Sequence, residues 1–364
     1  MVPASVTSHP MVFVTLTAPS FVAVHRETKA GEQCRRPDAA PTCPHGVPTG
    51  CGHSHNPDDS LVGQARCNEC YRYLEQVVFT WHAPELWSRF TLTLRRKLRR
   101  RLSELGHHPD STRVSFVKIV EMQRRGVPHF HAIIRLDGRS ACDQADVWIR
   151  PAIEASELEE VVSEAILAKH VDVLAEGREV IRLRFGAQYD IQPLSQDPGV
   201  VGQLSDGAVV ARRVEGYLAK YVTKSVVDFG LSPGRIVPSA IDHLDAAEHV
   251  KRLLRSVVQL SAEPGHEQMI ESLHTLGYRG HVTTKSRRYS TTMFALRTKR
   301  SRYLQSHFRE SGIEFVPNPE DTVWEYAAYG HASAGEHLLA ISAAVREKDA
   351  RWAARQLVDS GGES

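Results

Sequence analysis

Two histidines separated by one residue, His129 and His131, are the side chains of this sequence best placed to do chemistry. They lie in an apolar run whose composition is typical of a buried strand. Because side chains of a strand alternate between its faces, both imidazoles leave the same face, with about 7 Å between their Cα atoms. Phe130, Ala132 and Ile134 face the other way, toward a predicted core. Two imidazoles at this spacing can bind one divalent ion.

A glycine-containing connection, residues 123–128, joins this run to an upstream alternating segment and indicates a β-hairpin. Pairing centred on Arg125 places Glu121 opposite His129, and pairing centred one residue later places it opposite His131. Either register keeps the carboxylate on the histidine face, with Cβ atoms roughly 5 Å apart. Two neutral imidazoles and one carboxylate predict a site for Mn²⁺ or Mg²⁺ bound to a phosphate oxygen. The alternative is a pair of histidines that merely face solvent.

A second group of candidate residues lies further along the chain, in a segment with helical spacing. Tyr217 and Tyr221 share one face of this predicted helix, and Lys220 and Lys224 flank that face. A tyrosine hydroxyl with a pKa of about 10 is a poor nucleophile unless a metal polarises the phosphorus and a nearby cation favours the phenolate. Alone, the segment could be an ordinary amphipathic helix with half-buried tyrosines. Together with the histidine strand, it predicts attack of a tyrosine on phosphorus.

Three motifs resemble those of the HUH (His-hydrophobe-His) single-strand endonucleases, and they occur in the order found in that family. Residues 12–17 resemble the first motif, which is a core strand, and His129-Phe130-His131 resembles the metal motif. Residues 217–221 resemble the nucleophile motif of the two-tyrosine branch. The similarity extends to residues 43–46, 67–71, 82–87 and 277–290. Within the family, the sequence is most similar to rolling-circle replication initiators of actinobacterial plasmids and integrative elements.

The resemblance implies that a tyrosine attacks single-stranded DNA at an origin, leaving a 5′-phosphotyrosine link and a free 3′-OH that primes synthesis. Mn²⁺ or Mg²⁺ held by His129, His131 and Glu121 would orient the phosphate. Two tyrosines permit a second transfer that closes the circle, and we expect Tyr217 to cut first, since Tyr217 with Lys220 also fits the single-tyrosine pattern. The implied partners are origin DNA and a host helicase and polymerase. Relatives often carry more residues before the first motif, so an N-terminal accessory segment is expected to be missing here.

The cysteines predict a structural zinc site. Five of the six lie between residues 34 and 70, in a segment rich in Pro, Gly and Asp that has little apolar material for a core of its own. Cys67 and Cys70 have the spacing of a zinc knuckle, and Cys43 with Cys51 would complete a tetrahedral site. Cys34 and His45 are the alternative ligands. A redox-active Cys-x-x-Cys is disfavoured by the additional cysteines, and Cys142 is expected to take no part.

Net charge is only +2, but the basic residues are clustered. Residues 89–101 and 279–302 are rich in Arg and Lys and contain no acidic residue. Both stretches suit phosphate contacts, and aromatic residues in the second favour single-strand binding by stacking, although charge runs are often only solvated faces. The predicted DNA-binding residues are Arg95, Arg96, Arg99, Arg100, Lys285, Arg287, Arg288 and Tyr289.

The composition is that of an ordinary soluble protein, with 41% apolar and 24% charged residues in 364. The apolar run of residues 11–24 is broken by threonines and a proline and favours a strand over a signal peptide. No membrane-spanning segment is expected, and we predict a cytoplasmic protein.

The pattern of elements predicts an α+β fold, with a central antiparallel sheet and helices on one face. The resemblance relates that sheet to the RNA-recognition and palm folds. We expect strands near 11–18, 112–122, 129–136 and 180–194, and helices over 84–105, 154–175, 211–227 and 335–357. The predicted organisation is a first core strand in 1–30, a zinc-binding insert in 31–75, the catalytic core in 76–230 and a mainly helical, DNA-binding part in 231–364.

Other classes of protein fit the histidines, tyrosines and cysteines less well. A histidine-triad nucleotide hydrolase needs a third histidine where Ile133 stands, and a conjugative relaxase has its tyrosine before the histidines. A transposase of the same chemistry remains open, although transposases are usually shorter and have no such insert. A non-enzymatic zinc-dependent DNA-binding protein would account for the cysteines and arginines, but it gives the paired histidines and tyrosines no role.

Overall fold

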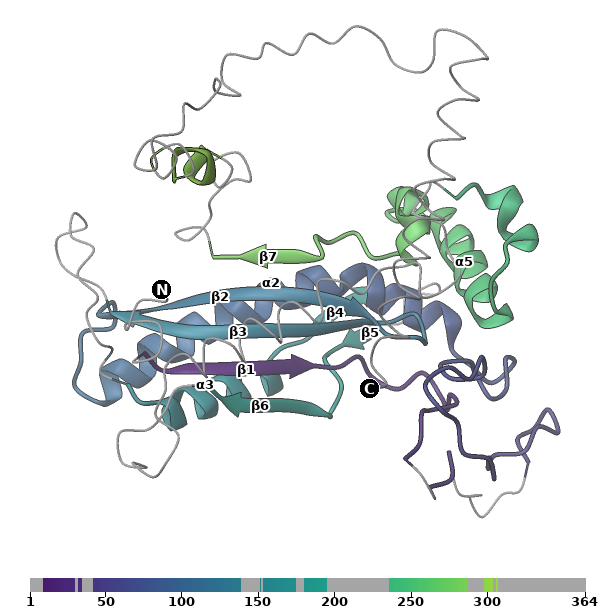
Figure 1. The fold of residues 1–364 in the computed structure, drawn as a ribbon, viewed down its shortest axis with the longest axis horizontal. Helices are drawn as coiled ribbons and strands as arrows, with labels where there is room; N and C mark the ends of the chain where they lie inside the picture. Colours follow the sequence, from purple (N-terminus) through teal and green to yellow (C-terminus); the bar gives the residue numbers. More distant parts are fainter. Residues whose placement is uncertain are drawn as a thin grey trace, which may run out of the picture. The chain divides into compact units, whose positions relative to one another are not determined.

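A five-stranded antiparallel sheet carries the histidine hairpin at its centre (Figure 1). Its strand order is β6-β1-β3-β2-β7, and β4 and β5 form a separate two-stranded sheet. The strands are β1 (Met11–Leu16), β2 (Thr112–Met122), β3 (Pro128–Gly138), β4 (Val171–Leu174), β5 (Val180–Leu183), β6 (Tyr189–Pro193) and β7 (Thr283–Lys285). The helices are α2 (Tyr73–Glu104), α3 (Ala155–Leu167) and α5 (Glu248–Ser261), with 3₁₀ helices η3 (Pro238–His243) and η4 (Glu267–Thr275).

The computed structural model describes residues 9–29, 32–34, 42–138, 151, 153–174, 180–194, 236–286, 298–303 and 306. The chain divides into two compact units, residues 1–290 and 291–364, and the elements above all belong to the first. The predicted helices at 211–227 and 335–357 lie outside the described residues. Within the described residues, no helix is both long and apolar enough to span a bilayer.

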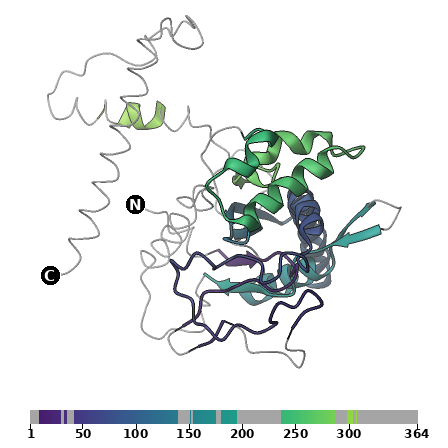
Figure 2. The ribbon, with the colours of Figure 1, turned by 90° about the vertical axis from the view of Figure 1, so that its right-hand side faces the viewer.

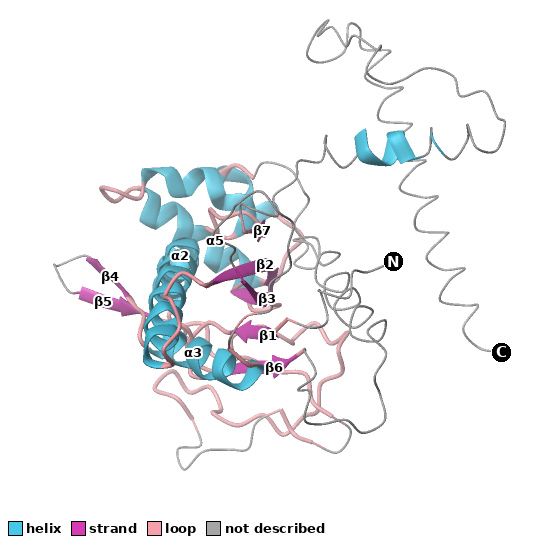
Figure 3. Ribbon diagram, turned by 90° about the vertical axis from the view of Figure 1, so that its left-hand side faces the viewer, coloured by secondary structure: helices cyan, strands magenta, loops and turns pink. Residues whose placement is uncertain are grey.

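The predicted α+β class with a central antiparallel sheet is confirmed. One face of the sheet is apolar because its strands alternate with period two, and α2 and α3 cover that face (Figure 3). Phe130 on β3 is fully buried there and stacks on Trp87 of α2, with 6.0 Å between ring centroids. Ala132 and Ile134 lie on the same face and are also buried, as predicted. His129 and His131 therefore project from the opposite face.

Helix α2 begins at Tyr73 and contains Pro84, so the prediction of a helix opening at Pro84 is wrong. A proline inside a helix removes one backbone hydrogen bond. The preceding turns bury Val77, Phe79 and Trp81 against the core, and this packing outweighs the lost bond. The helix thus reaches back to the cysteine-rich segment.

The predictions for residues 154–194 need two corrections. Helix α3 ends at Leu167 rather than near 175, because the β-branched residues that follow pair as β4 with β5. The single strand predicted over 180–194 is two strands, β5 and β6, which belong to different sheets. Gly186 separates them and lies so close to the segment that follows β1 that a Cβ there would be 2.6 Å from the carbonyl oxygen of Ala18.

Residues 236–276 are helical, and α5 packs beside α2 (Figure 2). The chain then returns to the sheet, where β7 pairs with β2 as an edge strand, with Val117 opposite Lys285. The sequence predicts a mainly helical part after residue 231, and β7 is a strand within it that the sequence pattern does not predict. Its consequence is that residues 283–285 lie in the same sheet as the histidine hairpin.

Candidate metal centre and the elements that hold it

Glu121, His129 and His131 form a compact group on the face of the β2–β3 hairpin that is opposite to α2 and α3. Their candidate ligand atoms all lie within 4.8 Å of one another. The hairpin is centred on Arg125, so Glu121 is directly opposite His129. Its carboxylate also reaches the diagonal neighbour, with 3.1 Å between Oε2 of Glu121 and Nε2 of His131. Two imidazoles and one carboxylate at these distances are a suitable donor set for one divalent cation.

His131 is buried, and two side chains of the neighbouring strand β1 contact its ring. Thr15 is its register partner on β1, and the Thr15 hydroxyl lies 3.3 Å from Nδ1 of the ring. The ring also stacks on Phe13, with 5.8 Å between centroids and 15° between planes. These two contacts orient the ring so that Nε2 lies beside Glu121, and Nε2 can act as a metal ligand when Nδ1 donates to the Thr15 hydroxyl.

His129 is held from the turn of its own hairpin. Nε2 of Gln123 lies 3.1 Å from Nδ1 of His129, and the Gln123 side-chain oxygen accepts a hydrogen bond from Arg125 at 3.0 Å. Arg125 in turn donates to the backbone carbonyls of Ala18 and Pro19, at 3.5 and 3.4 Å. The turn and the exit of β1 therefore act together to orient this imidazole.

The turn itself is anchored to the helices behind the sheet. Gln76 of α2 is fully buried and donates to the carbonyls of Arg125 and Gly126, at 2.9 and 3.0 Å. His249 of α5 places Nε2 3.1 Å from the Arg125 carbonyl and Nδ1 3.1 Å from the Tyr73 hydroxyl. Burial lowers the pKa of His249 to about 4, so the ring is neutral at pH 7.

The cysteine-rich segment contains two groups of four possible ligands rather than one. Cys43, His45, Cys67 and Cys70 form the first, and His25, Cys34, Cys51 and His55 form the second. The predicted zinc set Cys43, Cys51, Cys67 and Cys70 is thus only partly brought together. Cys51 lies in the other group because the chain turns away between Gly46 and Cys51, and His45, one of the two predicted alternatives, takes the fourth position.

Hydrogen bonds shape the first group. Nδ1 of His45 lies 3.2 Å from Sγ of Cys70 and 3.7 Å from Sγ of Cys67. Burial alone would raise the pKa of the Cys43 thiol. Hydrogen bonds from the backbone N–H groups of His45 and Val47 outweigh this effect, and the pKa is lowered to about 7. The turn after Cys43 therefore favours a thiolate, which is the form that binds metals.

The remaining predicted site residues are placed differently or lie outside the described part of the chain. Tyr217, Lys220, Tyr221 and Lys224 lie outside it, as do Arg287, Arg288 and Tyr289. Lys285 lies on β7 opposite Val117, and the alternation of the strands puts it on the histidine face. The exposed arginines of α2 are on the helical layer, behind the opposite face of the sheet: Arg95, Arg96, Arg99 and Arg100.

Four residues of these candidate sites are not identified by the sequence pattern. Thr15 lies within a predicted core strand, and its position opposite His131 depends on strand pairing between distant segments. Gln123 lies in the predicted turn, and the turn pattern gives no sign that its side chain contacts His129. His25 and His55 were not paired with any cysteine, although a histidine near a cysteine-rich segment is a signal that could have identified them.

The described fold and site define an α+β protein with a candidate divalent-metal centre on one face of an antiparallel sheet and a Cys/His-rich segment beside it. The sequence model of a family described as replication initiator protein, pSAM2, matches residues 1–345. The chain therefore belongs to this replication initiator family. It is also 35% identical, over 373 aligned positions, to a replication initiator protein of Streptomyces ambofaciens, with 99% of this chain and 76% of that protein covered. No solved structure matches it.

Proposed function

We propose that this replication initiator nicks one strand of DNA at a plasmid origin by metal-assisted attack of a tyrosine, and rejoins strands during rolling-circle replication. The group of Glu121, His129 and His131 carries the proposal, because a replication initiator that only bound DNA would not need it. Membership of the replication initiator family supports a role at an origin.

The donor set of the hairpin fits Mn²⁺ or Mg²⁺. The carboxylate of Glu121 lies beside Nε2 of His131, and Thr15 and Gln123 hold the two rings from behind. When bound there, the ion would orient the scissile phosphate and neutralise its oxygens. The chain's own contribution is to keep the three ligands in place before DNA arrives, which lowers the cost of ordering them.

The proposed nucleophile is the Tyr217 hydroxyl. Its oxygen forms a bond to phosphorus, the bond to the 3′ oxygen breaks, and the DNA is left with a 3′-OH and a 5′-phosphotyrosine link. Lys220 and Lys224 would favour the phenolate. Tyr221 would carry out the second transfer that closes the circle. All four residues lie outside the described part of the structure, so this assignment rests on the sequence pattern.

Basic residues on both layers are the proposed DNA contacts. Lys285 lies on the histidine face beside the hairpin, and Arg287, Arg288 and Tyr289 follow it in sequence. The arginines of α2 lie on the other layer, and Arg99 and Arg100 are already paired with Asp110 and Glu104. Contacts with single-stranded DNA are therefore proposed for residues 285–289. Helix α2 would contribute a weaker, salt-sensitive attraction to the DNA phosphates.

Structural zinc is proposed at Cys43, His45, Cys67 and Cys70. Their ligand atoms lie within 4.8 Å of one another, and the set of three thiolates and one imidazole is common for zinc.

A transposase of the same chemistry, or a zinc-dependent DNA-binding protein without catalysis, is the alternative function. A host helicase and polymerase are the proposed partners after nicking.

A covalent adduct tests the proposal. The full chain is incubated with Mn²⁺ and single-stranded oligonucleotides that tile a candidate origin, and a protein–DNA adduct is sought on denaturing gels. We expect an adduct that Tyr217→Phe reduces most and that the double change with Tyr221→Phe abolishes. Tyr189→Phe is the matched control, since its hydroxyl bonds Ser163 on the helical side. An adduct unchanged in the double variant would show that the nucleophile is wrongly assigned.

The hairpin is tested separately. His129→Ala or His131→Ala should stop cleavage while leaving binding of single-stranded DNA largely intact, as measured by fluorescence anisotropy. Loss of binding and cleavage together would instead indicate that the histidines maintain the structure. If DNA is bound but no fragment of the origin is ever cut by the unaltered protein, the non-enzymatic alternative is favoured.

A further inference from the structure

The second Cys/His group, formed by His25, Cys34, Cys51 and His55, has the geometry of a metal site. Nε2 of His55 lies 3.1 Å from Nδ1 of His25 and 3.4 Å from Sγ of Cys51, and Sγ of Cys34 lies 4.0 Å from Nδ1 of His25. A tetrahedral zinc ion with bonds of about 2.3 Å to sulfur and 2.0 Å to nitrogen separates its ligand atoms by about 3.3 to 3.8 Å. The observed distances bracket that range.

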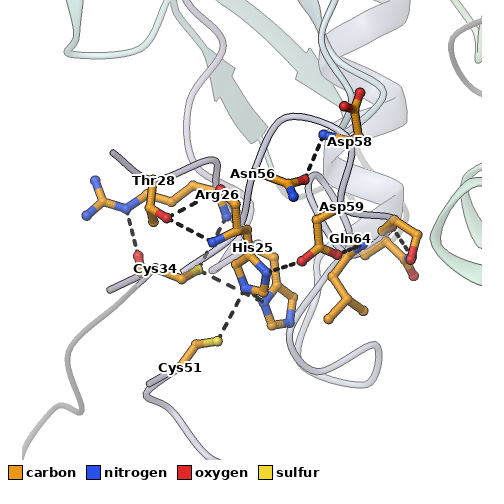
Figure 4. Close-up of polar contacts among 12 residues, drawn as sticks. His25, Arg26, Thr28, Cys34, Cys51, Asn56, Asp58, Asp59 and Gln64 are labelled. Atoms are coloured by element: carbon orange, nitrogen blue, oxygen red, sulfur yellow. Dashed lines mark hydrogen bonds and ion pairs between the residues drawn. The ribbon is translucent and has the colours of Figure 1, made fainter. Parts of the chain in front are cut away.

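The surroundings of these side chains are those of a structural site (Figure 4). Cys34, Cys51 and His55 are buried, with 1%, 7% and 2% of their surfaces exposed. The Asp59 carboxylate lies 2.6 Å from Nδ1 of His55 and accepts a hydrogen bond from its N–H, so Nε2 of the neutral ring presents a lone pair toward the other three side chains. Lone pairs of two imidazoles and two sulfurs directed at one point are stabilised by a cation and repel one another without it.

The two groups alternate along the chain. His25 and Cys34 belong to the second group, Cys43 and His45 to the first, Cys51 and His55 again to the second, and Cys67 and Cys70 again to the first. We propose that the segment from His25 to Cys70 is a cross-braced module that binds two zinc ions, the second of them through His25, Cys34, Cys51 and His55. This site goes beyond the proposed nicking function and does not depend on it.

The module has little else to hold it folded. Between Val22 and Cys70, the buried residues in the described part of the chain are three cysteines, His55 and Gly63, and none has a large apolar side chain. Named strands and helices are also absent from the described residues between Leu16 and Tyr73. Two ions that close interleaved loops would supply the missing stability, so removing either should loosen both.

The second site also contacts the catalytic hairpin. Arg124, in the turn between β2 and β3, donates to the carbonyls of Pro57 and Asp59, which follow His55. Gly63 lies against the Arg124 backbone so closely that a Cβ there would be 2.6 Å from its carbonyl carbon. Since Asp59 contacts His55 through its side chain and Arg124 through its backbone, the second zinc ion would support the turn that sets the register of Glu121 and His129.

Zinc content of the full chain tests the proposal. The protein is purified with zinc, dialysed, and measured by plasma mass spectrometry, with His129→Ala and His131→Ala introduced throughout so that the hairpin binds no zinc. We expect two zinc ions per chain, one after Cys34→Ser with Cys51→Ser, and one after Cys67→Ser with Cys70→Ser. Cys142→Ser is the matched control and should retain two. The second site is overturned if the protein with all its cysteines holds one zinc ion and loses it only when Cys67 and Cys70 are replaced. If that single ion is instead lost only when Cys34 and Cys51 are replaced, the second site stands and the first is rejected.

Two further measurements apply if the double variants fail to fold. In the unaltered protein, Cys34 and Cys51 should be protected from alkylation until a chelator is added, as mapped by mass spectrometry. Equal reactivity of these thiols with and without chelator contradicts the proposal. A Cys34–Cys51 disulfide contradicts it as well. In the cobalt-loaded protein, His55→Cys should keep two ions and strengthen the thiolate-to-cobalt charge-transfer band. An unchanged band would remove His55 from the ligand set.

Discussion

The carboxylate of Glu121 lies 3.1 Å from Nε2 of His131, although the register partner of Glu121 across the hairpin is His129. One carboxylate therefore faces both imidazoles, one directly and the other diagonally, as side chains on one face of an antiparallel pair can do. The two rings are themselves close, with 4.6 Å between centroids. Glu121 is therefore the carboxylate of the candidate metal group that lies within reach of both rings.

Replacing Glu121 by Gln keeps the shape of the side chain and removes its charge. We expect the affinity for Mn²⁺ to fall at least about tenfold, because loss even of an outer partner of a metal ligand has an effect of this size. Calorimetric titration of the metal-free protein measures it. Glu75→Gln, at an exposed carboxylate of α2, is the control and should bind Mn²⁺ as the unaltered protein does. Equal affinities for both variants would exclude Glu121 as a ligand.

Thr15→Val removes the hydroxyl that lies 3.3 Å from Nδ1 of His131 while keeping the β-branched shape of a strand residue. We expect Mn²⁺ affinity to fall about 10- to 100-fold, because the ring loses the hydrogen-bond partner that orients it. Thr15→Ser retains the hydroxyl and should restore most of the affinity. If the valine and serine variants bind Mn²⁺ equally, the hydroxyl has no part in orienting the ring.

Gly126→Ala tests the packing of the hairpin turn. Gly126 has a φ of +74°, and a Cβ there would lie 2.6 Å from Cδ1 of Leu253. We expect a loss of about 2 to 5 kcal/mol in the free energy of unfolding, from backbone strain and overpacking together. Gly106→Ala is a matched control, since its φ is +78° with nothing within 4 Å, and should cost only about 1 to 2 kcal/mol. Urea unfolding of both variants provides the comparison, and equal losses would mean that the contact with Leu253 is unimportant.

His249 predicts a loss of stability in mild acid. Burial lowers its pKa to about 4 in the folded protein, whereas the unfolded chain titrates near 6.5, so between these values the unfolded state binds the additional proton. Stability from this residue is complete above pH 6.5 and is lost as the pH falls toward 4. Between pH 7 and pH 5, the loss amounts to about 2 kcal/mol. His249→Gln should show a correspondingly shallower pH dependence in urea unfolding, and an identical dependence would contradict the assigned pKa.

The hairpin and the shared face of Glu121, His129 and His131 could be predicted because their signals are local. Alternation over residues 112–134 and the turn glycine Gly126 define two adjacent strands, and the choice of register does not change the face on which Glu121 lies. The buried face of β3 follows from the same alternation. Such features need no knowledge of distant parts of the chain.

What could not be predicted depends on contacts between distant segments. Thr15 meets His131 only because β1 pairs with β3, and β7 joins the sheet after a separate group of helices. The members of the two Cys/His groups are recognisable in pairs, such as Cys67 with Cys70, but the path of the loops decides which pairs come together. Helix α2 extends before Pro84 because burial outweighs a lost hydrogen bond, and a local proline rule does not include that burial.

The strand order has a consequence for synthesis on the ribosome. β1 is made first but lies between β3 and β6, so the apolar residues 11–16 stay without either neighbour until residues 128–138 and 189–193 have emerged. β7 is added later still, at 283–285. A nascent chain with such distant pairings folds slowly and exposes an unpaired strand while it grows. Production of this protein should therefore benefit from slower translation or from chaperones that shield its first strand.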